Sequence, residues 1–171
     1  INREFGKPDM IVGVATGGIA HGVLVAQEMG LPFAYVRSSV KGHGMKNTVE
    51  GDLTQGRSAV VVEDLVSTGK SSLTAVASLR ESDIEVKGMV SIFTYGLKEA
   101  TEAFGKAKVR LHALTNYNIL LQQAIADGYI TEKDLAPLKK WREDPANWSG
   151  AEGTAGNGTT TRKAAAEKPA K

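Results

Sequence analysis

The sequence predicts an α/β fold of the Rossmann-like kind, in which helices flank a central, mostly parallel sheet. Short apolar runs rich in β-branched residues alternate along the chain with segments of helical period, which is the pattern of strand-helix-strand units. The runs at 9–15 and 59–62 are apolar at nearly every position, as strands buried on both faces of a parallel sheet are. Small turns that open helices follow both runs.

The first part of the chain predicts two strands and one helix before a long loop. A helix is expected over 19–29, between the strand at 9–15 and a second strand at 33–36. The apolar positions that share one face of this helix are Ile19, Val23, Leu24 and Ala26. Residues 38–51 hold three glycines, two lysines and one histidine without a clear period, so we expect a functional loop closed by an edge strand at 48–51.

The second part continues the alternation. The strand at 59–62 leads into a helix that ends near Ser82, whose core-facing positions are expected to be Leu73, Val76, Ala77 and Leu79. The remaining elements expected are a buried strand at 86–94, a helix at 98–104, a half-exposed edge strand at 109–114, a helix at 116–127 and a last helix opened by Thr131. The inward positions of the last two helices are expected to be Ile119, Leu120, Ala124 and Ile125, then Leu135, Leu138 and Trp141.

Composition predicts one domain over 1–148 followed by a disordered tail at 149–171, which holds no large apolar side chain. The chain has no cysteine, which excludes a disulfide framework and a thiolate metal site. No apolar run approaches the roughly 18 residues of a membrane span, and nothing resembles a signal peptide. We therefore expect a cytoplasmic protein, and the abrupt start at Ile1 suggests a fragment.

Charge argues against nucleic acid as a partner. The formal net charge is +2. The last 21 residues contain four basic and two acidic side chains, which leaves 17 of the 21 basic and 17 of the 19 acidic residues for 1–150. The core therefore has no net field that would attract a polyanion.

The most informative stretch is Val60–Ser72, where a strand leads through two acids into a hydroxyl-rich turn that opens a helix. Backbone N–H groups and the helix N-terminus would converge there, which favours a phosphate. Gly69-Lys70-Ser71 matches the end of a triphosphate-binding loop, but the first glycine of that motif would fall on Asp64, whose carboxylate would repel a triphosphate. Acids beside a phosphate cradle suit a ligand with both a sugar and a phosphate, since carboxylates accept hydrogen bonds from vicinal hydroxyls.

This stretch closely resembles the phosphoribosyl-pyrophosphate (PRPP) signature of type I phosphoribosyltransferases. The resemblance spans roughly residues 10–145 and implies the fold of that family. It implies that Glu63 and Asp64 bind the ribose hydroxyls and that the following turn wraps the 5′-phosphate. The substrate-binding residues implied in this motif are Glu63, Asp64, Leu65, Val66, Ser67, Thr68, Gly69, Lys70 and Ser71.

A second anion loop is indicated by the glycine-rich turn after the first strand. Glycine pairs let the backbone approach a ligand closely, and the following helix N-terminus favours negative charge. In the resembled family the equivalent loop contacts pyrophosphate and often contains a non-proline cis peptide. The residues implied are Ala15, Thr16, Gly17 and Gly18.

The basic residues on or beside the long loop resemble the catalytic lid of orotate phosphoribosyltransferases in particular. The pattern is Arg-x-x-x-Lys-x-His-Gly followed by Glu-Gly. The resemblance implies that Arg37, Lys41 and His43 contact pyrophosphate and that Lys41 reaches the site of a neighbouring subunit in a homodimer. It implies catalytic roles for Lys41, His43, Glu63 and Asp64.

The resemblance as a whole implies transfer of a phosphoribosyl group from PRPP to orotate in UMP biosynthesis. Mg²⁺ would be carried by the diphosphate of the substrate rather than by a protein site, and neither nucleic acid nor membrane would be a partner. We expect this fragment to lack the N-terminal hood that such enzymes use for the base. His21, His112 and Tyr95 are interpreted as structural. Two alternatives stay open: a phosphoribosyltransferase for a purine or free pyrimidine, and a non-catalytic nucleotide- or RNA-binding regulator on the same fold.

Overall fold

A six-stranded sheet with the strand order β3-β2-β1-β4-β5-β6 forms the centre of the molecule. All neighbouring strands run parallel except β2 and β3, which are antiparallel. This computed structural model describes residues 1–37 and 49–148. The strands are β1 (Met10–Val14), β2 (Phe33–Val36), β3 (Val49–Gly51), β4 (Ser58–Val66), β5 (Glu85–Thr94) and β6 (Leu111–Asn116). The predicted α/β fold and mostly parallel sheet are confirmed.

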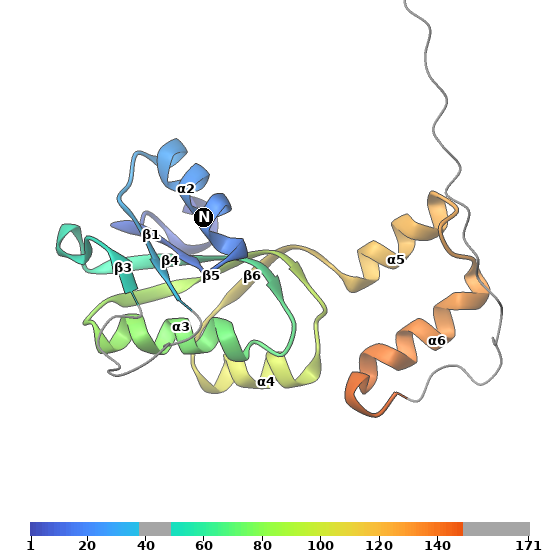
Figure 1. Ribbon diagram of the computed structural model, residues 1–171. Coiled ribbons are helices and arrows are strands. Elements are labelled where there is room, and N and C mark those ends of the chain that lie inside the picture. The colour runs from blue at the N-terminus through green and yellow to red at the C-terminus, as the bar shows by residue number, and fades with distance from the viewer. Residues whose placement is uncertain (38–48, 149–171) are drawn as a thin grey trace, which may run out of the picture.

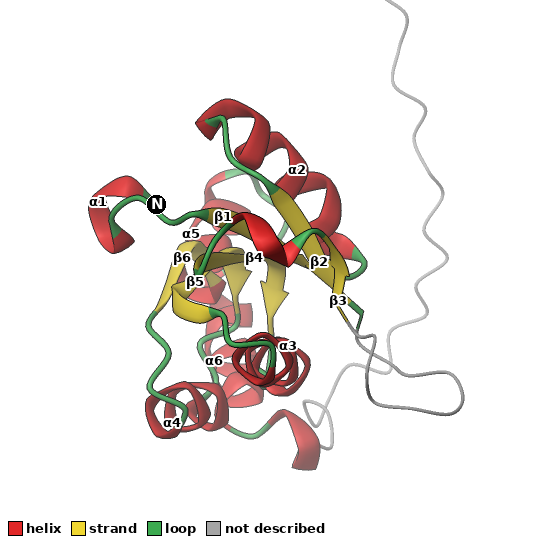
Figure 2. Cartoon of the chain, turned by 90° about the vertical axis from the view of Figure 1, so that its left-hand side faces the viewer, coloured by secondary structure: helices red, strands yellow, loops and turns green. Residues whose placement is uncertain are grey.

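Helices cover both faces of the sheet (Figures 1 and 2). The helices are α1 (Asn2–Phe5), α2 (Gly17–Met29), α3 (Lys70–Glu81), α4 (Lys98–Lys106), α5 (Tyr117–Ala126) and α6 (Glu132–Glu143), with short 3₁₀ turns at Leu53–Gln55 and Pro145–Asn147. Helix α2 lies on one face, and α3 and α4 lie on the other. The apolar side chains of β1 and β4 divide accordingly: Val12 and Val61 belong to the core beneath α3 and α4, and Ile11 and Val60 to the core beneath α2.

The contact face of α2 differs from the prediction. Val23 and Leu24 are 41% and 65% exposed, whereas the residues that α2 buries are Gly18, Gly22 and Ala26. The small residues allow a close approach to the sheet: a Cβ on Gly22 would lie 2.6 Å from Cε2 of Phe33. The prediction is confirmed for Ala26 and was wrong for Val23 and Leu24, because tight packing of backbone against the sheet selected glycine rather than large side chains.

The residues that α3 and α5 bury also differ from those predicted to face inward. In α3 the buried residues include Ala75 while Ala77 is exposed. In α5 the prediction of Ile119 and Leu120 as inward was wrong, since both are 49% exposed, and the buried residues are Tyr117 and Leu121. Tyr117 of α5 packs against Trp141 and donates to the carbonyl of Leu138, both in α6, and a short helix with apolar residues on several sides does not reveal such a rotation in its sequence.

The last helix, α6, begins as predicted. Thr131 is its N-cap, and Thr131 and Asp134 form a capping box. The ring of Trp141 lies 5.5 Å from that of Tyr95 and 5.4 Å from that of Tyr117, and the Tyr117 hydroxyl donates to the carbonyl of Leu138 at 3.3 Å. These contacts attach α6 to the carboxyl ends of β5 and β6.

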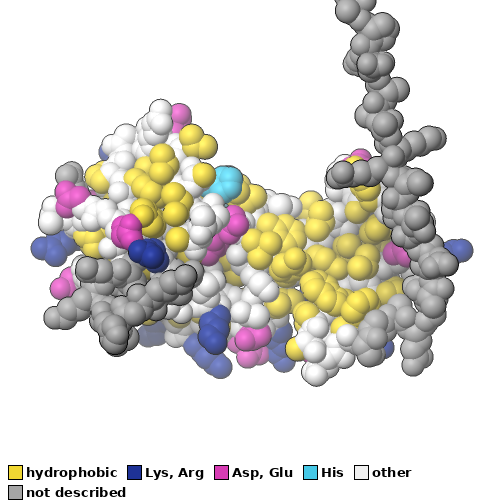
Figure 3. Space-filling view, in the orientation of Figure 1, with side chains coloured by type: hydrophobic (Ala, Val, Ile, Leu, Met, Phe, Trp, Pro, Cys, Tyr) yellow, Lys and Arg dark blue, Asp and Glu magenta, His cyan; other side chains and the backbone are white. Residues whose placement is uncertain are grey.

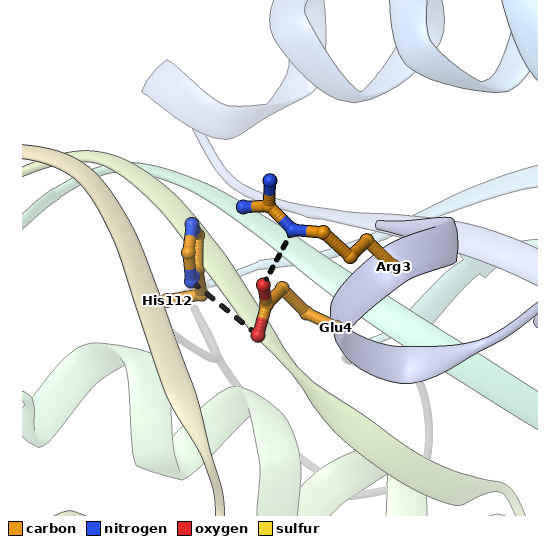
Figure 4. Close-up of polar contacts among 3 residues, drawn as sticks. All are labelled: Arg3, Glu4 and His112. Carbon is orange, nitrogen blue, oxygen red and sulfur yellow. Dashed lines mark hydrogen bonds and ion pairs between the residues drawn. The ribbon is translucent and has the colours of Figure 1, made fainter.

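The short helix α1 was not predicted. Figure 4 shows how it meets β6: Arg3 Nε donates to Glu4 Oε1 at 2.9 Å, and Glu4 Oε2 lies 3.9 Å from His112 Nδ1. The hydrogen bond from Arg3 is the main cause that lowers the pKa of Glu4. The guanidinium carbon of Arg110 lies 4.6 Å from the ring centre of Phe5. A four-residue helix has too few positions for a period, so only these tertiary contacts define it.

Several large apolar side chains of the described part are exposed, and Figure 3 shows broad apolar areas on one face, notably over α5 and α6.

Within residues 1–37 and 49–148, no helix has the length and apolar character needed to cross a bilayer. The predicted tail at 149–171 lies outside the described residues.

Candidate active site

The strand order creates a switch point between β1 and β4. From β1 the chain passes through α2 to β2 on one side, and from β4 it passes through α3 to β5 on the other. The turns after β1 and β4 therefore leave adjacent parallel strands in opposite directions at their carboxyl ends. In open α/β sheets, ligands bind in the crevice outside such a point.

The two turns meet at Gly17 and Asp64. A Cβ on Gly17 would lie 2.0 Å from Oδ2 of Asp64, and a Cβ on Gly18 would lie 2.4 Å from the carbonyl oxygen of Val62. Glycine is required at position 18, because a side chain there would meet the backbone of β4, whereas a side chain at position 17 would displace the carboxylate of Asp64. The Ala15–Thr16 peptide bond is cis, as the resemblance led us to expect. The predicted anion loop and the predicted acids are thus brought together.

The hydroxyl-rich turn occupies residues 67–69, and α3 begins at Lys70. Gly69 is the N-cap and adopts φ 80°, a left-handed conformation that favours glycine. A Cβ there would also lie 2.7 Å from Cε2 of Phe104 in α4. The start of this twelve-residue helix is exposed at Lys70 and Ser71, so its free N–H groups are available to an anion.

The predicted strand does not end before the two acids, and as part of that strand their side chains point in different directions. Strand β4 continues to Val66, and successive side chains of a strand alternate between faces. Asp64 is exposed on the side of α2. Glu63 is only 5% exposed, and its Oε2 accepts a hydrogen bond of 3.0 Å from Ser72 Oγ of α3.

Burial is the main cause that raises the pKa of Glu63 to about 7, and the hydrogen bond with the side chain of Asp64 acts in the same direction. The hydrogen bonds that Glu63 accepts from Ser72 Oγ and from the Asp64 N–H act in the opposite direction. The acid pair therefore combines an exposed carboxylate with an inner carboxyl group that changes charge near neutral pH.

Arg37 lies at the start of the predicted lid and is held by Glu50 on β3. Its Nη1 donates to Glu50 Oε1 at 2.9 Å, and the Tyr35 hydroxyl donates to Oε2 of the same carboxylate. The hydrogen bond from Tyr35, followed by that from Arg37, lowers the pKa of Glu50. The predicted lid residues Lys41 and His43 lie outside the described residues.

Other candidate residues are placed away from this grouping. Tyr95 packs edge-on against Phe93 with ring centres 5.1 Å apart and contacts Tyr117 and Trp141, which supports its interpretation as structural. His112 pairs with Glu4, and His21 is exposed on α2. Among the described residues, no group of three or more His, Cys, Asp or Glu side chains is arranged to hold a metal ion.

Comparison with known proteins identifies the family. A model of the phosphoribosyl transferase domain matches residues 1–110. The chain is 54% identical over 146 residues to an orotate phosphoribosyltransferase from Phocaeicola vulgatus, covering 85% of this chain and 69% of that protein. The chain belongs to the orotate phosphoribosyltransferases.

Two other members of this family support the same assignment. An orotate phosphoribosyltransferase from Bacteroides thetaiotaomicron is 54% identical over 148 residues, which cover 86% of this chain and 70% of that protein. The crystal structure of an orotate phosphoribosyltransferase from Aeropyrum pernix aligns with a TM-score of 0.64 at 30% identity, covering 71% of this chain and 67% of that chain. The type I phosphoribosyltransferase fold predicted from the sequence is confirmed.

Sequence reasoning missed one contact at this orotate phosphoribosyltransferase site. Ser72 is 1% exposed and occupies a core-facing position of α3 together with Val76 and Leu79. A serine one helical turn before buried apolar residues was the signal available, because a buried hydroxyl needs a hydrogen-bond partner. That partner is Glu63.

Proposed function

We propose that this chain transfers the phosphoribosyl group of PRPP to orotate, giving orotidine 5′-monophosphate and pyrophosphate in UMP biosynthesis. The observation that carries the proposal is the meeting of two strand-helix turns at the switch point, with Asp64 against Gly17. Together with family membership, this arrangement supports separate binding sites for the 5′-phosphate, the ribose and the diphosphate of one PRPP molecule.

The 5′-phosphate would bind at the turn before α3. Free N–H groups and the helix dipole favour an anion there, and the hydroxyls of Ser67, Thr68 and Ser71 add donors around it. The left-handed Gly69 supports this role, since it turns the chain tightly enough to start the helix at Lys70. Binding energy from this remote group would position the reacting carbon.

The ribose hydroxyls would donate to the acid pair. Asp64 is exposed and adjoins the turn after β1, which supports a direct contact. Glu63 lies behind it and is almost fully buried, so we assign it the inner side of the ribose site. Negative charge beside the sugar would also stabilise the positive charge that develops on the ribose as the leaving group departs.

The diphosphate would lie against the residues Ala15, Thr16, Gly17 and Gly18 at the start of α2. The lack of side chains at Gly17 and Gly18 lets Asp64 and the backbone of β4 lie directly against this loop, and the helix N-terminus favours the negative charge of the diphosphate. By the family resemblance, Arg37, Lys41 and His43 would add cationic donors. Arg37 would exchange its exposed partner Glu50 for the diphosphate.

The donor set fits Mg²⁺ delivered with the substrate, because carboxylate and phosphate oxygens are the ligands that Mg²⁺ prefers. When bound to the diphosphate, the ion would supply charge neutralisation of the leaving group.

The chemical step needs no covalent nucleophile from the protein. The bond between the anomeric carbon and the diphosphate oxygen breaks, and its electron pair leaves with pyrophosphate. A ring nitrogen of orotate bonds to that carbon and loses its proton to solvent. The residues of this chain would hold the two substrates in line and, with the lid closed, exclude the water that would otherwise hydrolyse PRPP.

We further propose a homodimer in which Lys41 of one subunit completes the site of the other. This arrangement rests on the resemblance of the lid pattern to that of the family.

Turnover of matched acceptors tests the function. The purified chain is incubated with PRPP, Mg²⁺ and one acceptor at a time: orotate, uracil, adenine or hypoxanthine. We expect orotidine 5′-monophosphate and stoichiometric pyrophosphate from orotate alone. Product from another base with none from orotate would assign a different phosphoribosyltransferase, and PRPP binding without any product would favour a regulatory role.

A further inference from the structure

Glu63 and Ser72 connect the two halves of the proposed donor site. Glu63 lies on β4, directly after the buried apolar residues of that strand and directly before the exposed Asp64. Ser72 lies in the first turn of α3, which follows the phosphate turn. Their side chains are joined by a hydrogen bond of 3.0 Å, with Glu63 5% and Ser72 1% exposed. A buried hydrogen bond to a carboxyl group is not exchanged with water, so it fixes the acid relative to the helix.

A second hydroxyl lies beside Glu63 on the neighbouring strand. Ser91 of β5 is the register partner of Glu63 in the parallel β4–β5 pair. Register partners in a sheet point to the same face from strands about 4.8 Å apart. Ser91 is 0% exposed, and its Oγ is the one buried side-chain N or O atom in the described residues without a hydrogen-bond partner.

A buried hydroxyl without a hydrogen-bond partner is unfavourable, so its presence next to a carboxyl group calls for a reason. Alanine at this position would fill nearly the same space without that penalty. A turn of the Glu63 carboxylate toward its register partner would give Ser91 an acceptor. Ser91 is therefore placed to donate to Glu63 when the carboxylate ionises or turns.

We propose that Ser72 and Ser91 are positioning residues that hold Glu63 between them and so set the geometry of the ribose acid relative to the phosphate turn. This inference rests on the proposed function of the site. Neither serine touches the substrate: both act through Glu63. Ser72 transmits the position of the phosphate turn to the acid, and Ser91 supplies a second donor from the side of β5.

The surroundings of Glu63 allow the effect of the two serine hydroxyls on its pKa to be measured. Among the described residues that act on its pKa, Asp64 is the only charged one, and the side chains that face it from α3 and β5 include the neutral Ser72 and Ser91. A hydroxyl that donates to the carboxylate favours its charged form and lowers its pKa. Removal of either hydroxyl should therefore raise the pKa of Glu63 further.

The experiment measures the titration of the Glu63 carboxyl by ¹³C NMR in the free protein, and the pH dependence of the KM for PRPP. The variants are Ser72→Ala, Ser91→Ala and the conservative Ser72→Thr, which keeps a hydroxyl. The matched control is Ser78→Ala, which removes a serine of α3 whose hydroxyl donates only to the backbone carbonyl of Thr74.

We expect Ser72→Ala and Ser91→Ala to move the Glu63 titration upward and to shift the pH dependence of KM in the same direction. The KM for PRPP should rise severalfold near neutral pH with a smaller change in kcat. Ser72→Thr should restore wild-type behaviour, and Ser78→Ala should change nothing. If Ser72→Ala does not fold, the comparison of Ser72→Thr and Ser91→Ala with wild type carries the test.

Unchanged titration of Glu63 in Ser91→Ala, with increased stability, would overturn the role of Ser91. A shifted titration with an unchanged KM profile would show that the serines act on the carboxyl but not on the donor site, and would overturn the proposal. The NMR titration needs no substrate, and wild-type turnover is measured beside it. A failure of the proposed function is thereby distinguished from a failure of this inference.

Discussion

Gly17 lies against the carboxylate of Asp64, so closely that a Cβ at position 17 would stand 2.0 Å from Oδ2. These residues come from different strand-helix units, and their contact joins the proposed diphosphate loop to the proposed ribose acid. The other acid, Glu63, contacts α3 through Ser72. Each acid thus packs against the first turn of one of the two helices that flank the switch point.

The first prediction concerns this contact. In Gly17→Ala the new methyl group must displace the Asp64 carboxylate, which can swing away because it is the free end of a side chain. We expect an intact fold and a rise in the KM for PRPP of about tenfold, equivalent to about 1.4 kcal/mol of lost donor binding. Steady-state kinetics and thermal unfolding measure both quantities.

The matched control for that variant is Gly105→Ala. Gly105 lies in α4, and a Cβ added there would have no atom within 4 Å, so alanine should stabilise the helix by about 0.5–1 kcal/mol without a kinetic effect. An unchanged KM in Gly17→Ala would contradict a role for the Gly17–Asp64 contact in donor binding.

The second prediction concerns the phosphate turn. Gly69→Ala introduces a side chain at φ 80° and against Phe104, whereas Gly128→Ala introduces one at φ 73° into open space. Both variants should lose about 1–2 kcal/mol for the left-handed conformation. Gly69→Ala should lose more stability through the steric contact, and it alone should weaken PRPP binding. Urea unfolding and calorimetric titration with PRPP compare the two, and equal losses would contradict the close packing of α4 on the turn.

The third prediction concerns pH. Burial raises the pKa of Glu63 from 4.5 to about 7, so the folded protein binds this proton more tightly than the unfolded chain. The resulting stabilisation is fully present below the unfolded pKa and is lost as the pH rises through about 7. Glu63→Gln should remove this part of the pH dependence. We would measure urea unfolding of both proteins at about pH 5 and about pH 8; parallel changes in the two would contradict the raised pKa.

The fourth prediction concerns the lid proposed by resemblance. Lys41→Ala should lower kcat at least tenfold, because a cationic donor to the leaving diphosphate is lost, while the exposed Lys106→Ala should leave it unchanged. Mixing Lys41→Ala with an inactive Asp64→Asn protein should restore part of the activity if Lys41 acts across a dimer. A mixture no more active than its components would indicate a site completed within one chain.

Much of the fold could be predicted from the sequence because buried parallel strands are recognisable as nearly continuous apolar runs. The buried runs in β1 and β4, the edge position of β6 and the start of the last helix at Thr131 were predicted from residue type and order. Element bounds were harder to place: β4 runs three residues beyond Glu63 because pairing with β5 continues to Val66 and Thr94. A strand end depends on such pairing, which lies far away in the sequence.

Helix rotation was the main failure, and its cause is physical. In α2 the sheet contact uses Gly18 and Gly22, so the large apolar residues Val23 and Leu24 remain exposed. In α5 the contact is made by Tyr117 and Leu121. Hydrophobicity alone does not distinguish a face that packs closely through small residues from one that packs through large residues.

The site was predicted in its parts but not in its internal geometry. Gly17 and Gly18 of the predicted loop lie against Asp64 and Val62, and the roles that the resemblance implied for residues 67–71 stay predictions. The separation of the acids onto two faces, and the roles of Ser72 and Ser91, depended on the register of β4 and β5 and on the position of α3. Those relationships join residues that the sequence presents as unrelated.

The most direct test is a crystal structure with PRPP and Mg²⁺ bound. We predict the 5′-phosphate on the N–H groups of residues 67–71, a ribose hydroxyl within about 3.2 Å of the Asp64 carboxylate, and the diphosphate against residues 15–18. A donor bound elsewhere, or bound with its ribose hydroxyls turned away from Asp64, would contradict the proposed site.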